Sequence, residues 1–180
     1  MTLAEKIGAP AKPSLLLEKA ARLGLGNAGM LEALAVARGC WHYQHPEMAE
    51  PPKLSEAQFT NEELAIALLS PSLPYSPHTI RVGAAMLGAE GNGAESLAEL
   101  AASEGCEMVV RYIAEAASEF EPEHRFWTEL LRRLHDTSEP AEGILPHPTR
   151  FVSMTGITRA GRGRVTNWIR PRPELAAAHG

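Results

Sequence analysis

Three side chains in the N-terminal half of the chain are of the types that bind zinc. Cys40, His42 and His45 lie close together, and a structural zinc site takes four such ligands in a tetrahedron. A fourth ligand could come from Cys106, His124 or His147. The spacing matches no strong zinc signature, because the chain has no C-x-x-C pair and no H-x₃₋₅-H partner. A metal or catalytic site around these residues is therefore one hypothesis, and a loop packed by Trp41 and Tyr43 is the simpler interpretation.

The motifs of common catalytic sites are missing from the chain. It contains no G-x-S-x-G segment, no G-x-x-x-x-G-K-[ST] phosphate loop and no H-E-x-x-H helix. The acidic run 119–123 is typical of a helix start, where carboxylates complement the helix dipole. We therefore expect a non-enzymatic protein that needs no cofactor.

Arginine is concentrated near the C-terminus, where a different chemistry is indicated. Six of the 17 Lys and Arg residues lie in the last 35 positions, against the single carboxylate of Glu174. The remaining residues hold eleven Lys and Arg against twenty-one Asp and Glu, a formal charge of about −10 beside about +5 for the C-terminal segment. Such asymmetry indicates that the two parts face different partners. The arginines are Arg150, Arg159, Arg162, Arg164, Arg170 and Arg172.

The arginine-rich segment is the candidate binding site, formed by these six arginines and Trp168. A guanidinium group binds phosphate through two hydrogen bonds, and an indole ring can stack on a base. Three partners remain open. The arm could bind nucleic acid, the acidic surface of another protein, or the acidic body of its own chain, where Glu119, Glu121, Glu123 and Glu129 offer carboxylates.

The junction between the acidic and basic parts has its own candidate site. His147 and Arg150 are close together where the acidic segment ends. Together these two side chains could bind a small anion. The alternative is a structural role, in which Phe151 attaches the arm to the body.

Two strand-like runs in the basic segment predict a β-hairpin. Residues 151–155 and 165–169 are rich in β-branched and aromatic residues, and glycine-containing sequence separates them. The alternative is a helix-turn-helix with residues 165–168 on the recognition helix. Gly161 and Gly163 oppose that alternative, because each costs a helix about 1 kcal/mol relative to Ala.

The rest of the chain is predicted to be helical. Helices are expected from Pro13-Ser14, over about 28–38, after Thr60, from Pro77, over about 95–103, through 108–116 and from Glu121-Pro122. Thr60 and Glu63 fit a capping box, and Ser76 before Pro77 fits an N-cap followed by proline at the first helical position.

These patterns predict an all-α fold. Short links between helices of similar length favour stacked antiparallel helical hairpins, either HEAT-like or an irregular bundle, with a short C-terminal basic arm. We expect a helical body at 1–136, a linker at 137–149 and the arginine-rich arm at 150–180.

Composition limits the functional classes. A net charge of −5 and a pI near 5.8 argue against nucleic-acid binding by the whole surface. No apolar run approaches the ~18–20 residues of a membrane span, no signal peptide is recognisable, and two cysteines are too few for a disulfide framework. We expect a cytoplasmic bacterial adaptor that binds a protein partner through a helical groove and the basic arm, with nucleic-acid binding as the alternative and no membrane association. The sequence does not predict the oligomeric state.

Overall fold

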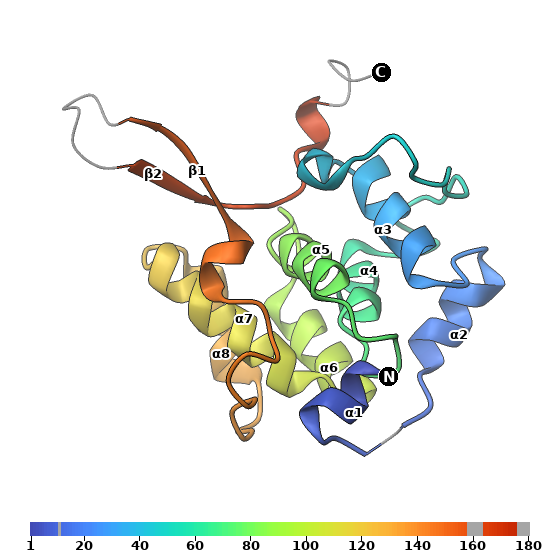
Figure 1. Cartoon of the computed structure of the whole chain (residues 1–180), viewed down its shortest axis with the longest axis horizontal. Helices are drawn as coiled ribbons and strands as arrows, with labels where there is room; N and C mark the ends of the chain where they lie inside the picture. Colours follow the sequence, from blue (N-terminus) through green and yellow to red (C-terminus); the bar gives the residue numbers. More distant parts are fainter. Residues whose placement is uncertain (11, 158–163, 176–180) are drawn as a thin grey trace.

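The fold is mostly helical, with one small antiparallel sheet (Figure 1). The computed structural model describes residues 1–10, 12–157 and 164–175. Within these residues the helices are α1 (Leu3–Ile7), α2 (Leu15–Arg22), α3 (Ala28–Ala37), α4 (Asn61–Leu68), α5 (Pro77–Leu87), α6 (Ala94–Glu104), α7 (Glu107–Phe120) and α8 (Arg125–Arg133). The strands are β1 (Val152–Ile157) and β2 (Arg164–Trp168), and short 3₁₀ helices lie at η1 (Trp41–Tyr43), η2 (Pro148–Phe151) and η3 (Pro173–Leu175).

Local capping explains where the helices begin, and most of the predicted starts are confirmed. Thr60 and Glu63 form the expected capping box at α4, since each side chain accepts a hydrogen bond from the other residue's backbone N–H. Ser76 caps α5, whose first residue is Pro77. The five-residue α1 was not predicted, because it is too short to show helical periodicity.

The predicted start of the last helix is wrong. Helix α8 begins at Arg125, not at Glu121-Pro122. Glu121 is instead the C-cap of α7, and the backbone N–H of His124 donates to its carbonyl oxygen, which closes a turn between the two helices.

Helix α4 lies at the centre of the helical body. It contacts α2, α3, α5 and α6, and the five residues 64–68 are all buried. A helix that is apolar on every side needs neighbours all round it. In a stacked repeat, by contrast, each unit contacts only its neighbours in sequence. The all-α prediction is therefore confirmed in outline, and the HEAT-like arrangement is not.

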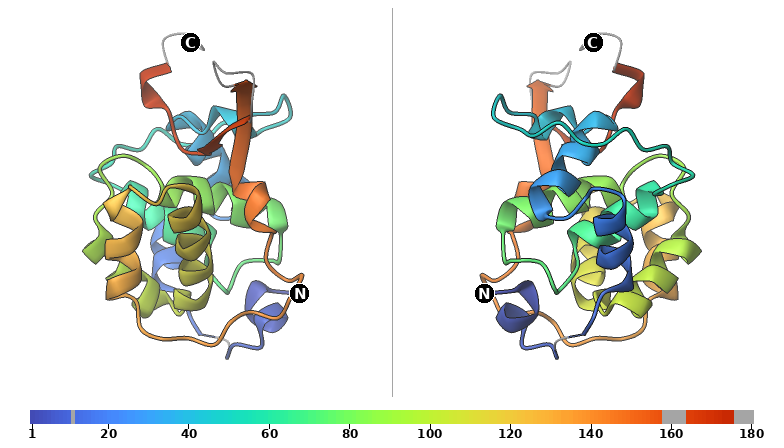
Figure 2. Two further views of the ribbon diagram at one scale, coloured as in Figure 1. Left: turned by 90° about the vertical axis from the view of Figure 1, so that its left-hand side faces the viewer. Right: turned by 90° about the vertical axis from the view of Figure 1, so that its right-hand side faces the viewer.

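The β-hairpin prediction is confirmed, and the helix-turn-helix alternative is wrong. Strand β1 pairs antiparallel with β2, with Val152 opposite Trp168 and Thr155 opposite Val165. Residues 165–168, which would have lain on the recognition helix, lie in β2, as their β-branched and aromatic content favours. Figures 1 and 2 show the strands extending away from the helices.

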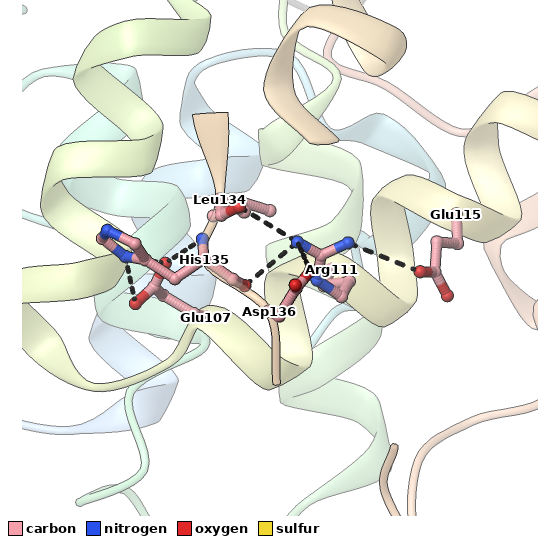
Figure 3. A network of polar contacts seen from close by, with 6 residues as sticks. All are labelled: Glu107, Arg111, Glu115, Leu134, His135 and Asp136. Carbon is pink, nitrogen blue, oxygen red and sulfur yellow. Dashed lines mark hydrogen bonds and ion pairs between the residues drawn. The ribbon is translucent and has the colours of Figure 1, made fainter. Parts of the chain in front are cut away.

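The segment between α8 and the hairpin lies against the helical body. Arg111 of α7 donates to the carbonyl oxygens of Leu134 and His135, both at 3.0 Å, and Glu107 accepts the backbone N–H of His135 (Figure 3). Further along, the Tyr112 hydroxyl donates to the Pro146 carbonyl oxygen at 2.8 Å. The segment is thus attached to the body near both of its ends, and the proposed boundaries at 136 and 149 stay a prediction.

The hydrophobic core continues from the helices into the base of the hairpin. Leu145, Phe151, Val152, Trp168 and Ile169 belong to the same buried cluster as the helical core. No helix in the described ranges combines the length and apolar content of a transmembrane span.

Candidate interaction site at the base of the hairpin

Aromatic packing fixes the base of the hairpin on the helices. Trp168 is 1% exposed, and its ring centroid lies 5.3 Å from that of Trp127 in α8 and 5.6 Å from that of Phe151. Its indole N–H donates to the carbonyl oxygen of Ala84 at 3.2 Å. Buried aromatic pairs of this kind contribute about 0.5–1.5 kcal/mol beyond their burial, so the hairpin leaves the body from a firm attachment.

The close approach of Trp168 to α5 depends on Gly88. A Cβ built at Gly88 would lie 2.9 Å from Cδ1 and 3.0 Å from Nε1 of Trp168. The φ of Gly88 is −84°, so the constraint is steric contact and not backbone conformation. The C-cap of α5 is therefore shaped to receive the indole ring.

Arg170 forms the second attachment, a bidentate ion pair with Glu121. Its two terminal guanidinium nitrogens donate to the two oxygens of Glu121, each at 2.8 Å, and its Nε donates to the Gly88 carbonyl oxygen at 3.0 Å. Glu121 Oε2 also accepts the indole N–H of Trp127 at 2.7 Å.

The environment of Glu121 lowers the pKa of its carboxyl group. Burial acts to raise that pKa and is the largest single influence. The hydrogen bonds from Arg170 and Trp127, with the positive charge of Arg170, together outweigh it and hold the pKa below its ordinary value. Glu121 is therefore ionised at neutral pH and is a charged partner for Arg170.

The chain beyond Arg170 attaches to the first half of the protein. The backbone N–H of Arg172 donates to the carbonyl oxygen of Gly39 at 2.9 Å, and the Trp41 indole N–H donates to the carbonyl oxygen of Arg172 at 3.0 Å. Gly39 has a φ of +114°, and a Cβ there would lie 2.7 Å from the backbone N of Pro173. Both its positive φ and the close approach of the chain at Arg172 and Pro173 therefore require glycine at position 39.

The structure divides four of the seven predicted binding residues into attachments and exposed side chains. Trp168 and Arg170 are attachments of the hairpin to its own body, so one of the four proposed carboxylates, Glu121, does receive an arm arginine. Arg150 on η2 and Arg172 are exposed, and Arg172 lies 3.9 Å from Glu174. The remaining three are Arg164, whose backbone lies in β2, and Arg159 and Arg162, which lie outside the described residues.

The zinc-type residues are not brought together. Among the described residues, no three His, Cys, Asp or Glu side chains are grouped in a way that could hold a metal. Cys40 is buried against Met86, and burial raises the pKa of its thiol to about 12. His42 and His45 are exposed. Cys106 is also buried and free, so neither thiol is a reactive thiolate at neutral pH.

One basic residue beside the hairpin was not identified from the sequence. Arg81 of α5 donates from Nε to the carbonyl oxygen of Arg150 at 3.3 Å, and its guanidinium lies 5.6 Å from the centre of the Tyr43 ring. Arg81 is isolated in the sequence, 69 positions before Arg150. No local pattern could have joined these two residues.

Comparison with known proteins gives no relative for this chain: no protein-family model, no curated protein and no solved structure matches it.

Proposed function

We propose that this protein is a non-enzymatic interaction protein that binds an acidic partner through its arginine-rich hairpin. The observation that carries the proposal is the firm attachment of the hairpin by Trp168 and by the Arg170–Glu121 pair. An arm with a fixed base loses less conformational entropy when it binds than an unattached tail would.

The distribution of apolar surface favours the arm over a helical groove as the contact. Among the described residues, the large hydrophobic side chains that are exposed are Met1, Leu15 and Leu175. They belong to three different parts of the chain: Met1 precedes α1, Leu15 begins α2 and Leu175 ends η3. A partner held by charge and hydrogen bonds therefore fits this surface better than one held by an apolar helix face.

Charge limits where a negatively charged partner can bind. Residues 1–145 carry about −10, which repels such a partner from most of the body. The arm carries Arg159, Arg162 and Arg164, and its strands extend away from the helices (Figure 2). We favour the acidic surface of a cytoplasmic protein as the partner and keep nucleic acid as the alternative. The proposal does not require the helices to form a repeat stack.

The test replaces the three hairpin arginines together, as R159Q/R162Q/R164Q. The control is R22Q/R125Q/R132Q, which removes the same charge from exposed positions on α2 and α8. Each protein is used as bait in lysate of the source organism, with and without nuclease, and is titrated against labelled DNA and RNA at two salt concentrations.

Partners that the wild type and the control retain, and that the hairpin variant loses in nuclease-treated lysate, would support the proposal. Binding to DNA or RNA that weakens with salt and requires the hairpin arginines would instead support the nucleic-acid alternative. If the hairpin variant recovers the same partners as the wild type, the arm is not the interaction site.

A further inference from the structure

A cavity of about 680 Å³ lies beside the hairpin base, separate from the hairpin itself. Its walls are Tyr75 and the first turns of α5, Tyr112 of α7, the segment 140–147 and Arg150. This volume falls within the ~300–1,000 Å³ of known small-molecule sites. Trp168, Arg170 and Glu121, which attach the hairpin to the body, do not line this cavity.

Hydrogen bonds from two tyrosines hold one wall in place. Tyr75 donates its hydroxyl to the Ile144 carbonyl oxygen at 2.5 Å, and Tyr112 donates to the Pro146 carbonyl oxygen at 2.8 Å. Leu145, which lies between the acceptor residues Ile144 and Pro146, is buried in the core. The segment predicted as a linker is thereby fixed as a wall, and the aromatic side chains of Tyr75 and Tyr112 both line the cavity.

The cavity carries an excess of positive charge. Arg81 and Arg150 both line it, and neither forms an ion pair with a carboxylate of the described residues. Arg111, Arg133 and Arg170, by contrast, contact glutamates. Two adjacent arginines without carboxylate partners are the groups that an anionic ligand would need.

His147 adds a hydrogen-bond donor to the same cavity. The backbone N–H of Thr149 donates to His147 Nδ1, so the neutral ring carries its proton on Nε2. Pro77, the first residue of α5, also lines the cavity, and the N-terminus of this 11-residue helix is its positive end. The one carboxylate among the lining residues is that of Glu142.

We propose that this cavity binds a small phosphorylated molecule that carries a planar ring. Arg81, Arg150 and His147 hold the phosphate, and the ring lies against Tyr75 and Tyr112. A phosphate monoester carries about −1.5 to −2 charges at neutral pH, which suits two guanidinium groups better than the single charge of a carboxylate does. Glu142 can accept hydrogen bonds from hydroxyl groups of the ligand.

The experiment titrates the full chain with AMP, adenosine and inorganic phosphate, by calorimetry and by NMR of the labelled protein. We expect AMP to bind more tightly than phosphate, and adenosine not to bind over the same range. Signals of residues around Tyr75 and Tyr112 should shift with AMP. Arg150→Gln, at an exposed position whose side chain forms no hydrogen bond or ion pair within the described residues, should weaken AMP binding about tenfold, the effect of losing one charge-assisted hydrogen bond.

Arg22→Gln is the matched control, since it removes one charge from an exposed position on α2 and should leave AMP binding unchanged. Arg81→Gln is a second test and should also weaken binding. The proposal is overturned if AMP gives no saturable change, if adenosine or phosphate binds as tightly as AMP, or if Arg150→Gln and Arg22→Gln have the same effect.

Discussion

Replacing Glu121 by glutamine tests whether its ion pair attaches the hairpin to the body. The substitution keeps the size of the side chain and removes its charge. Arg170 then retains its interaction with Gly88 but loses both carboxylate contacts, each 2.8 Å in the wild type. Its guanidinium group would stay largely buried without a counter-ion.

The expected magnitude follows from the exposure of the pair. The side chains of Arg170 and Glu121 are 17% and 18% exposed. Exposed pairs contribute about 0–1 kcal/mol, whereas breaking a fully buried pair costs about 3–5 kcal/mol. A bidentate pair at this depth lies between the two, so we expect Glu121→Gln to lower the free energy of unfolding by about 2 kcal/mol. For a chain of this length, that corresponds to a fall in Tm of about 4–8 °C.

The assay is urea unfolding followed by tryptophan fluorescence, which reports on the base of the hairpin because Trp127 and Trp168 lie there, 5.3 Å apart. A double-mutant cycle with Arg170→Met isolates the pair, since the bond from Arg170 to Gly88 is lost in both the single and the double variant. Arg132→Gln, which breaks an exposed pair on α8, should leave the midpoint unchanged. A coupling energy below about 0.5 kcal/mol would refute the assigned role of the pair.

Three further results are expected. As pH falls from about 5, the wild type should lose stability that Glu121→Gln does not lose. The folded-state pKa of Glu121 lies below its ordinary value of 4.5, so the stability that its charge contributes is complete above 4.5 and disappears as the pH drops through the folded-state pKa. Parallel profiles of Tm against pH for the two proteins would contradict this. Gly88→Ala should lower the free energy of unfolding by about 1–3 kcal/mol and shift the fluorescence of Trp168, because the new methyl group would lie 2.9 Å from the indole ring. An unchanged Tm would show that the ring can move aside. Thr60→Ala should lower the free energy of unfolding in urea by about 1 kcal/mol, because the α4 capping box is lost, whereas Thr60→Ser should lower it much less. Equal losses in the two variants would exclude capping as the cause.

The local structure of this protein could be predicted from its sequence. The starts of α4 and α5 were evident because a cap depends on residues three positions apart, as with Thr60 and Glu63. The β-hairpin was evident because β-branched and aromatic residues are concentrated in both strands. The charge asymmetry between the body and the arm is likewise a property of the sequence alone.

The tertiary structure decided which of these residues serve as attachments and which stay exposed. Arg170 and Arg172 are the same residue type two positions apart, but Arg170 binds Glu121, 49 positions away, and Arg172 stays exposed. Its residue type makes Trp168 suitable for stacking on a base, but in the fold its indole N–H donates to the carbonyl oxygen of Ala84, 84 positions earlier. Arg81 and Arg150 meet at one cavity for the same reason. Caps and periodicity are set by neighbours a few residues apart, whereas these contacts depend on how the whole core packs, and no short stretch of sequence contains that information.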